Sequence, residues 1–356
     1  MGSEMCIRDS VCISLLCALT GALTLVASHT SPDRHFEQFT SQLFQEEMTG
    51  STLNMHYTIA DPKTFGISEY EPVLPIYHSD QPEDSKEHCS DLLHRLDRID
   101  PDRLSPENAY TYRLLHRSLE NDLALADFPY YNEPLSPSSG MQSQLPVLLA
   151  EYTFRTKRDV TDYLALLDQI DDYFASLLLY EQEKAAAGFF MPACSSEKVR
   201  KQCDTIVTTE ELAQGTHFLQ TTFEDRLSEL QKQGLFTPEE TASLIKTNNR
   251  LLVTVVQPAY AALSEGLHSL ETSTNADSTA SETTTNTASG KNSSAHNGLP
   301  KGLALLPDGK TYYLHLLFSE TGSSRSEKEL VQMLLVQFQK EQSAICLLYT
   351  SPSPRD

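Results

Sequence analysis

The sequence has 356 residues, enough for two ordinary domains or one large helical one. Its 49 acidic and 27 basic side chains give a formal net charge of −22 at pH 7. So acidic a chain is poorly suited to nucleic acid or to an anionic membrane surface, because both carry the same charge. We therefore expect no nucleic-acid partner, and membrane contact only through the N-terminal segment.

The two ends of the sequence, residues 1–10 and 346–356, look unlike protein. The strings MCIRDS and CLLYTS within them can be encoded by DNA strings that are reverse complements of each other. This pattern resembles a sequencing adapter read through at both ends of a short contig, so both segments are set aside from fold reasoning. The interpretation predicts that the natural protein continues past Ile345 and that this chain is an N-terminal fragment.

An uncharged apolar run, VCISLLCALTGALTLVA, occupies most of residues 11–28. Such a run matches the core of a signal peptide or a short N-terminal membrane anchor. We therefore expect an exported protein, either extracellular or in the cell envelope, with the choice between cleaved signal and anchor left open. Cys194 and Cys203 could form a disulfide in an oxidising compartment, or remain as buried free thiols.

Helical signals begin at Ser31, which is followed by proline and predicts a helix over about 32–48 that Gly50 ends. The Asp61-Pro62 turn then indicates an irregular segment. Another helix is expected over about 82–99.

The next start signal is sharper, with Ser105 as the N-cap and Pro106 at the first helical position. This helix should end before Pro129. Its expected inward positions are Tyr110, Leu114, Leu115, Leu119 and Leu123.

A Pro/Ser/Gly-rich turn segment, residues 134–144, leads into the centre of the chain. Residues 159–187 read as one long helix, because apolar positions recur at steps of three and four residues. Glu181 interrupts that stripe, and Gly188 is placed to end the helix.

Further helices are predicted at about 195–207 and 209–234. Thr237 and Glu240 form a capping box that opens the next helix. Pro258 lacks a backbone donor, so that helix should kink or break just before it and then resume to Leu270.

Residues 271–298 contain no large apolar side chain and predict a disordered Ser/Thr/Asn-rich insertion. Asp308 could cap a helix that starts at Lys310, and a last helix should begin near Ser326. With almost no alternating strand pattern, the predicted fold class is all-α. The expected architecture is a multi-helix array over residues 31–270 that continues, truncated, at 299–345.

No complete catalytic motif is present: the sequence lacks His-Glu-x-x-His, a Gly-rich phosphate loop and a Gly-x-Ser-x-Gly elbow. His88 and His94 are six residues apart, off a common helical face, and are interpreted as solvated. Asp168, Asp171 and Asp172 are interpreted as the solvated face of the central helix.

Four blocks in order do carry a family resemblance. They resemble the bacterial family catalogued as domain of unknown function 885, and together they span most of residues 31–345. The blocks are SPDRHFEQFTSQLFQEEMTGSTLNMHYTIADPKTFGI, PLSPSSGMQSQLPVLLAEYTFRTKRDVTDYLALL, AGFFMP and GLALLPDGKTYYLHLLFSETG.

This resemblance implies a large all-helical zincin-like metallopeptidase fold, akin to neurolysin and helical carboxypeptidases. In such a site, two histidines and a carboxylate hold zinc, which activates a water for attack on a peptide carbonyl. The expected His-Glu-x-x-Pro-Gly-His motif and its downstream glutamate would lie beyond Ile345. Zinc is therefore expected only in the full-length protein, and no catalytic or metal-binding residue is assigned here.

The role implied for this chain is scaffold and part of a cleft wall for a peptide substrate. The candidates for cleft-facing positions follow irregular backbone, where polar groups can point at a peptide: Ser139, Gly140, Gln142 and Tyr313. The chain alone should be catalytically inert and should expose apolar surface where its other half docks. The alternative is a non-enzymatic helical binding or cell-surface module, which a downstream His-Glu-x-x-x-x-His in the uninterrupted gene would argue against.

Overall fold

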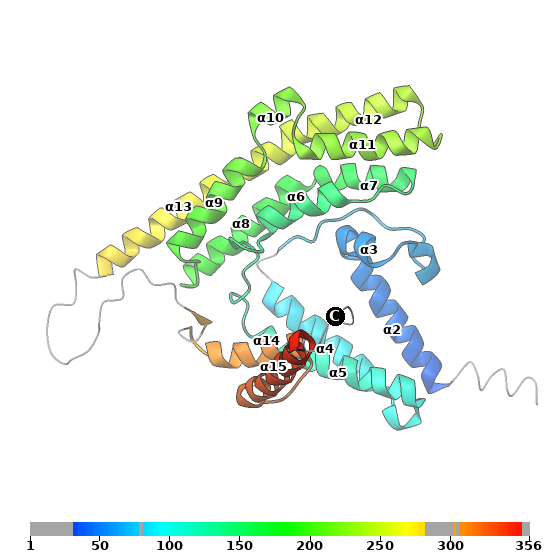
Figure 1. The fold of residues 1–356 in the computed structure, drawn as a ribbon, viewed down its shortest axis with the longest axis vertical. Helices are drawn as coiled ribbons and strands as arrows, with labels where there is room; N and C mark the ends of the chain where they lie inside the picture. Colours follow the sequence, from blue (N-terminus) through cyan, green and yellow to red (C-terminus); the bar gives the residue numbers. More distant parts are fainter. Residues whose placement is uncertain (1–30, 78–80, 282–301, 304–305, 351–356) are drawn as a thin grey trace, which may run out of the picture. The chain divides into compact units, whose positions relative to one another are not determined.

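The computed structural model describes residues 31–77, 81–281, 302–303 and 306–350 (Figure 1). Within these ranges every regular element is a helix, which confirms the predicted all-α class. The chain divides into two compact units, Met1–Lys301 and Gly302–Asp356. The predicted export segment and the N-terminal adapter-like segment lie outside the described residues.

Helices α2 (Pro32–Thr49), α4 (Gln81–Leu96) and α5 (Pro106–Leu125) pack together at the N-terminal side of the first unit, with the short 3-10 turn Pro101–Arg103 between α4 and α5. Both predicted caps form, because the hydroxyls of Ser31 and Ser105 accept backbone N–H groups three residues on. The buried cluster of this region is Phe36, Phe39, Leu92, Leu96, Tyr112 and Leu119.

The predicted inward face of α5 is partly wrong. Tyr110 and Leu114 are 58% and 52% exposed, whereas Tyr112 and Leu119 are buried. The contacts with α2 and α4 select the face that carries Tyr112, and this rotation of the helix is a tertiary effect.

A helix occupies part of the segment expected to be irregular. Helix α3 (Thr52–Thr58) starts at Ser51, whose hydroxyl accepts the N–H of Asn54, and a 3-10 turn follows at Pro62–Phe65. Apolar side chains from α2, α3 and the following loop form a small core: Met48, Met55, Ile59 and Ile67.

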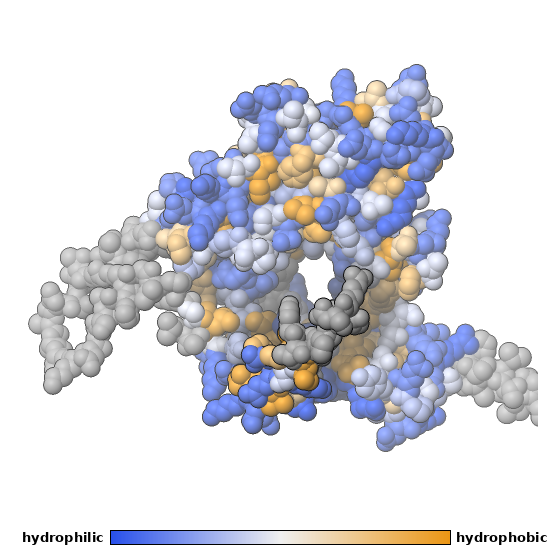
Figure 2. Space-filling view, viewed as in Figure 1, coloured by the Kyte–Doolittle hydropathy of each residue, from blue (hydrophilic) through white to orange (hydrophobic). Residues whose placement is uncertain are grey.

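The larger core of the first unit lies among helices that follow residue 140. Figure 1 shows these green to yellow helices as a layer on the other side of the unit from α4 and α5, and Figure 2 shows an opening between the two groups. In order they are α6 (Met141–Glu151), α7 (Lys157–Leu167), α8 (Ile170–Ala186), α9 (Ala193–Ile206), α10 (Thr209–Gln214), α11 (Phe218–Lys232), α12 (Pro238–Leu251), a π-helical turn (Leu252–Val256) and α13 (Gln257–Ser281).

The central rod expected over residues 159–187 is two helices, α7 and α8, that meet at Asp168 and Gln169. The Gln169 side chain accepts the N–H of Leu74 (3.1 Å) and donates to the carbonyl of Pro72 (2.9 Å). The break between α7 and α8 therefore lies where the Gln169 side chain holds the extended segment before α4. We call these two hydrogen bonds of Gln169 the tether. Glu181 does not interrupt the buried face as expected, because it is itself 0% exposed.

Some of the other predicted helix boundaries are confirmed and others are wrong. The helix expected over 209–234 is interrupted at Gly215, which has a left-handed φ of 69°. The capping box of Thr237 and Glu240 forms as predicted. The expected irregularity before Pro258 is the π-helical turn. Helix α13 continues as far as Ser281, into the segment predicted to be disordered, and the rest of that segment lies outside the described residues.

The second unit contains α14 (Gly309–Thr321) and α15 (Glu327–Thr350). Asp308 lies before α14 in a left-handed conformation (φ 52°) and makes no side-chain cap, contrary to the prediction. Ser326 does start α15, with its hydroxyl accepting the N–H of Glu329 (3.4 Å). Large apolar side chains of α15 are exposed, including Leu334 (70%) and Phe338 (64%), and hydrophobic residues gather over this helix in Figure 2.

Candidate functional site

A pocket of about 540 Å³ lies between α3, the Pro62–Phe65 turn and the link from α6 to α7. Both polar and apolar groups line it. A second, mostly apolar pocket of about 320 Å³ lies beside other α3 residues, including Leu53 and Tyr57. The short helix α3, which the sequence pattern did not reveal, thus contributes to both.

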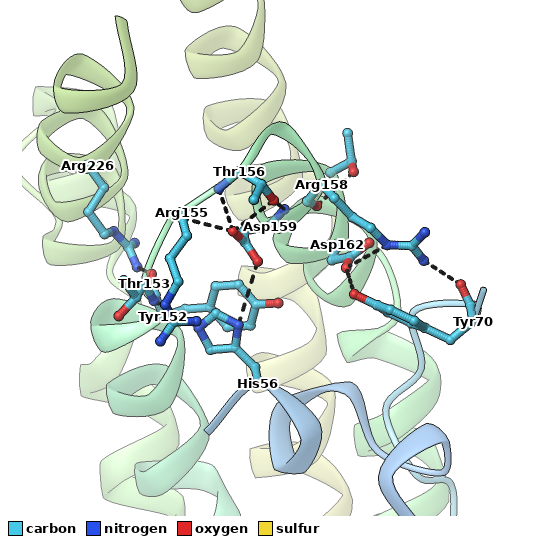
Figure 3. A network of polar contacts seen from close by, with 11 residues as sticks. His56, Tyr70, Tyr152, Thr153, Arg155, Thr156, Arg158, Asp159, Asp162 and Arg226 are labelled. Atoms are coloured by element: carbon cyan, nitrogen blue, oxygen red, sulfur yellow. Dashed lines mark hydrogen bonds and ion pairs between the residues drawn. The ribbon is translucent and has the colours of Figure 1, made fainter. Parts of the chain in front are cut away.

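His56 forms the buried side of the larger pocket (Figure 3). Its Nε2 accepts the backbone N–H of Thr153 (3.1 Å), so in the neutral ring the proton lies on Nδ1. The ring stacks on Tyr152, with centroids 3.6 Å apart and planes 12° from parallel. His56 is thus held in one orientation and one tautomer.

The imidazole is neutral at pH 7. Burial lowers the pKa of His56 to about 4; Asp159 acts in the opposite direction, and the cations Arg155 and Arg226 add to the lowering. At neutral pH the pocket therefore contains a hydrogen-bond donor, Nδ1–H, that carries no charge.

Asp159 faces His56 from the first turn of α7. Its Oδ2 accepts the backbone N–H groups of Arg155 (2.8 Å) and Thr156 (2.7 Å), as well as the Thr156 hydroxyl (3.0 Å). Its Oδ1 is 3.9 Å from His56 Nδ1, too far for a hydrogen bond. One carboxylate oxygen thus caps the helix, and the other lies toward the pocket as an acceptor.

Three cations also line the pocket, and they differ in their partners. Arg158 is bonded to the carboxylate of Asp162 (3.4 Å) and to the carbonyl of Tyr70, and its guanidinium lies 3.8 Å from the centroid of the Tyr70 ring. Among the described residues, the side chains of Lys63 and Arg155 have no hydrogen-bond or ion-pair partner, and both are exposed.

The Asp162 carboxylate closes the network on the far side of Arg158. It accepts the Tyr70 hydroxyl (2.6 Å), and burial is the main cause that raises the pKa of Asp162 against the opposing effects of Tyr70 and Arg158. Burial and Asp162 together raise the pKa of Tyr70 to about 12, so the phenol remains a donor. The guanidinium of Arg158 is therefore already paired within the protein, and its interactions stabilise the fold.

Arg226 supports the floor of the pocket from α11. Its guanidinium donates to the carbonyls of Leu149 (3.1 Å) and Tyr152, and it lies 4.5 Å from the centroid of the Phe154 ring. These bonds satisfy carbonyls where α6 ends and fix Tyr152 beneath His56. The site is therefore built on buried, rigid groups.

None of the residues predicted to face a substrate lines this pocket. Gln142 is 0% exposed, and its amide donates to the carbonyl of Ser136 (2.6 Å) and to Gln202 (2.8 Å). Ser139 is exposed, Gly140 is buried at the start of α6, and Tyr313 is 38% exposed in the second unit. Contact of these four with a peptide stays a prediction.

The sequence pattern does not identify His56 or Asp159 as residues of a site, for different reasons. Thr156 and Asp159 have the spacing of a capping box, so that local role was readable. The approach of His56 to Thr153 joins segments separated by 97 residues along the chain, which no local pattern reveals. His88, His94 and the three predicted surface aspartates are exposed, as expected.

Among the described residues no cluster of three His, Cys, Asp or Glu side chains could hold a metal ion. In the same ranges, no helix combines the length and the apolar character that a membrane crossing requires. Cys194 and Cys203 are both free thiols, and burial raises the pKa of Cys203 to about 12.

The fold and the pocket define a helical protein with a ligand-sized cavity lined by polar and apolar groups, and the comparisons place it in a family. Residues 63–346 match the family described as "Bacterial protein of unknown function (DUF885)", and the chain belongs to that family. No curated protein matches the chain.

The fold is similar to that of a solved structure, a "putative lipoprotein from Colwellia psychrerythraea", at a TM-score of 0.62 and 15% sequence identity. The match covers 90% of this chain and 52% of that protein, so this chain spans about half the length of its structural neighbour. At this identity the likeness concerns the fold alone.

Proposed function

We propose that this chain is the peptide-binding, non-catalytic helical part of an exported zinc-dependent peptidase, and that the pocket around His56 contacts the peptide. The observation that carries the binding role is the pocket itself. Its volume of about 540 Å³ falls in the range of small-ligand sites, roughly 300–1,000 Å³. It offers the neutral donor of His56, the acceptor of Asp159 and two unpaired cations, a mixture that suits the alternating donors and acceptors of a peptide.

The peptidase part of the proposal rests on the family resemblance of the ordered blocks in the sequence. Residues expected to hold zinc belong to the segment proposed to follow Ile345, and no residue of this chain is given that role. Export rests on the apolar run at residues 11–28.

The alternative, a non-enzymatic helical binding or cell-surface module, draws support from α15. Its exposed apolar side chains, among them Leu334 and Phe338, are of the kind that mark protein–protein contact surfaces. A module of this kind would bind a partner through α15 and cleave nothing.

The two functions are separated by assaying peptide hydrolysis with the product of the uninterrupted gene, with and without a chelator. The peptidase proposal expects hydrolysis that the chelator abolishes and that zinc restores, whereas the present chain should be inert. A complete protein that carries the zinc motif yet neither binds zinc nor cleaves peptides would favour the binding module.

A further inference from the structure

The donor and the acceptor at the bottom of the pocket face each other without pairing. The Nδ1 of His56 carries its proton, since Nε2 is occupied by the N–H of Thr153. Its nearest carboxylate oxygen, Oδ1 of Asp159, is 3.9 Å away. Both side chains are largely buried, at 6% and 16% exposure, so each orientation is fixed by the protein. A ligand that fits here presents an acceptor and a donor close together.

The charged side chains around His56 and Asp159 further restrict the class of ligand that the pocket can bind. Arg155 lies close enough to His56 to help lower its pKa, and its guanidinium extends toward that ring in Figure 3. Lys63 lines the same pocket from the Pro62–Phe65 turn. Both cations lack a partner among the described residues, whereas Arg158 is already paired with Asp162. The two free cations favour a carboxylate on the ligand.

We propose that this pocket binds an α-carboxylate together with the nitrogen on its neighbouring carbon, the arrangement found at the C-terminus of a peptide and in a free α-amino acid. The carboxylate accepts from His56 Nδ1–H and pairs with Arg155 and Lys63. The adjacent N–H donates to Asp159 Oδ1. The inference rests on the proposed peptide-binding function and names the part of the peptide that is recognised.

Other simple ligands fit this arrangement less well. Inorganic phosphate would pair with the two cations and its remaining O–H would donate to Asp159 Oδ1, but the second negative charge of its dianion would be repelled by that carboxylate. A cation would pair with Asp159 and be repelled by Arg155 and Lys63. An α-carboxylate with an adjacent N–H satisfies both halves.

Titration calorimetry on the whole chain tests this inference with four probes: N-acetyl-trialanine, its C-terminal amide, free alanine and inorganic phosphate. We expect the acid to bind at least about tenfold more tightly than the amide, because the amide lacks the charge-assisted bonds. Arg155→Gln should weaken binding of the acid by about tenfold or more and leave the amide unaffected. Lys63→Gln should act in the same direction.

Exposed cations outside the pocket supply matched controls, Arg103→Gln and Lys246→Gln, which should bind like the parent chain. Because Arg155 and Lys63 are exposed and unpaired, these substitutions should leave the melting temperature unchanged. Tighter binding of free alanine than of the acetylated acid would identify an amino acid, through its ammonium on Asp159, as the source of the same recognised group.

Equal binding of acid and amide, or loss of acid binding in neither pocket variant, would overturn the carboxylate assignment and leave peptide binding intact. Phosphate binding as tight as that of the acid would also overturn it. If no peptide and no amino acid binds, both the inference and the proposed function of this chain fail.

Discussion

Glu181 and Lys184 lie on the same side of α8, both buried, and do not bond to each other. The Lys184 ammonium donates to the carbonyl of Asn132 (2.9 Å) and pairs with Glu133 (2.8 Å). Both carboxyl oxygens of Glu181 lack a hydrogen-bond partner among the described residues. An unpaired buried carboxylate is costly, so this position should favour the protonated acid.

The first prediction concerns the pH dependence that Glu181 imposes on stability. Burial raises the pKa of Glu181 to about 7 from its ordinary 4.5, with Lys184 opposing and Glu133 adding to the rise. Between these two pH values the folded state binds the extra proton, so the free energy of unfolding should fall as pH rises from 4.5 to 7. The total loss is on the order of 3 kcal/mol.

Glu181→Gln should remove this loss and stabilise the chain at pH 8, where the parent carries the buried charge. Urea unfolding at pH 5 and pH 8 measures the difference. Glu183→Gln, on the same helix but only partly buried, is the control and should retain the parent's pH dependence. An unchanged slope in Glu181→Gln would show that another group causes it.

The second prediction is the opposite pH dependence of His56. Its folded-state pKa is about 4, against 6.5 for the ordinary side chain, so the folded state binds fewer protons in between. The stability that neutral His56 permits is therefore present above pH 6.5 and is lost as pH falls toward 4, by up to roughly 3 kcal/mol.

Proton NMR of the histidine ring signals checks this directly, with His56→Gln assigning the resonance. The His56 signal should not titrate above about pH 5. A His56 midpoint near 6.5 would mean that the ring is not buried as described.

A feature of this fold can be predicted from the sequence when the interactions that determine it join residues close together along the chain. Ser105 and Thr237 were recognisable as caps because each bonds to a backbone group three residues away. The whole all-α class follows from such local signals together with helical periodicity. Tyr110 and Leu114 were misassigned because the choice of buried face on α5 depends on α2 and α4.

The pocket around His56 could not be predicted from local sequence patterns. His56 lies in the seven-residue helix α3. The turn residues that follow this helix favour the prediction of an irregular segment, so the sequence pattern does not reveal it. The tautomer of His56 is set by Thr153, and the floor of the pocket by Arg226, which is distant in sequence. Each of these residues looks ordinary in isolation, and only their long-range contacts make a site.

The third prediction tests the tether at the junction of α7 and α8. Gln169→Ala should lower the free energy of unfolding by about 1–3 kcal/mol, because the N–H of Leu74 loses its acceptor in a partly buried setting. Amide exchange should accelerate at Leu74 and Tyr77, whereas Gln182→Ala on the exposed side of α8 should change neither quantity. Unaltered exchange at Leu74 would contradict the tether.

The fourth prediction separates two glycines that look equivalent in the sequence. A Cβ at Gly140 would lie 2.0 Å from Gln142 Oε1 and 2.2 Å from the backbone nitrogen of Ser136, and backbone atoms cannot simply rotate away. Gly140→Ala should therefore destabilise the chain by about 3 kcal/mol or more through overpacking.

At Gly50 the nearest atoms to a Cβ are 3.4 Å and 3.5 Å away, and the backbone is right-handed helical (φ −70°). Gly50→Ala should be neutral or stabilising by up to about 1 kcal/mol, because alanine restricts the unfolded chain more than glycine does. Chemical denaturation of the two variants in parallel measures both effects. Equal stability of the two would mean that the Ser136–Gln142 turn opens at little cost, and the turn could then rearrange toward the substrate contacts predicted for Ser139 and Gln142.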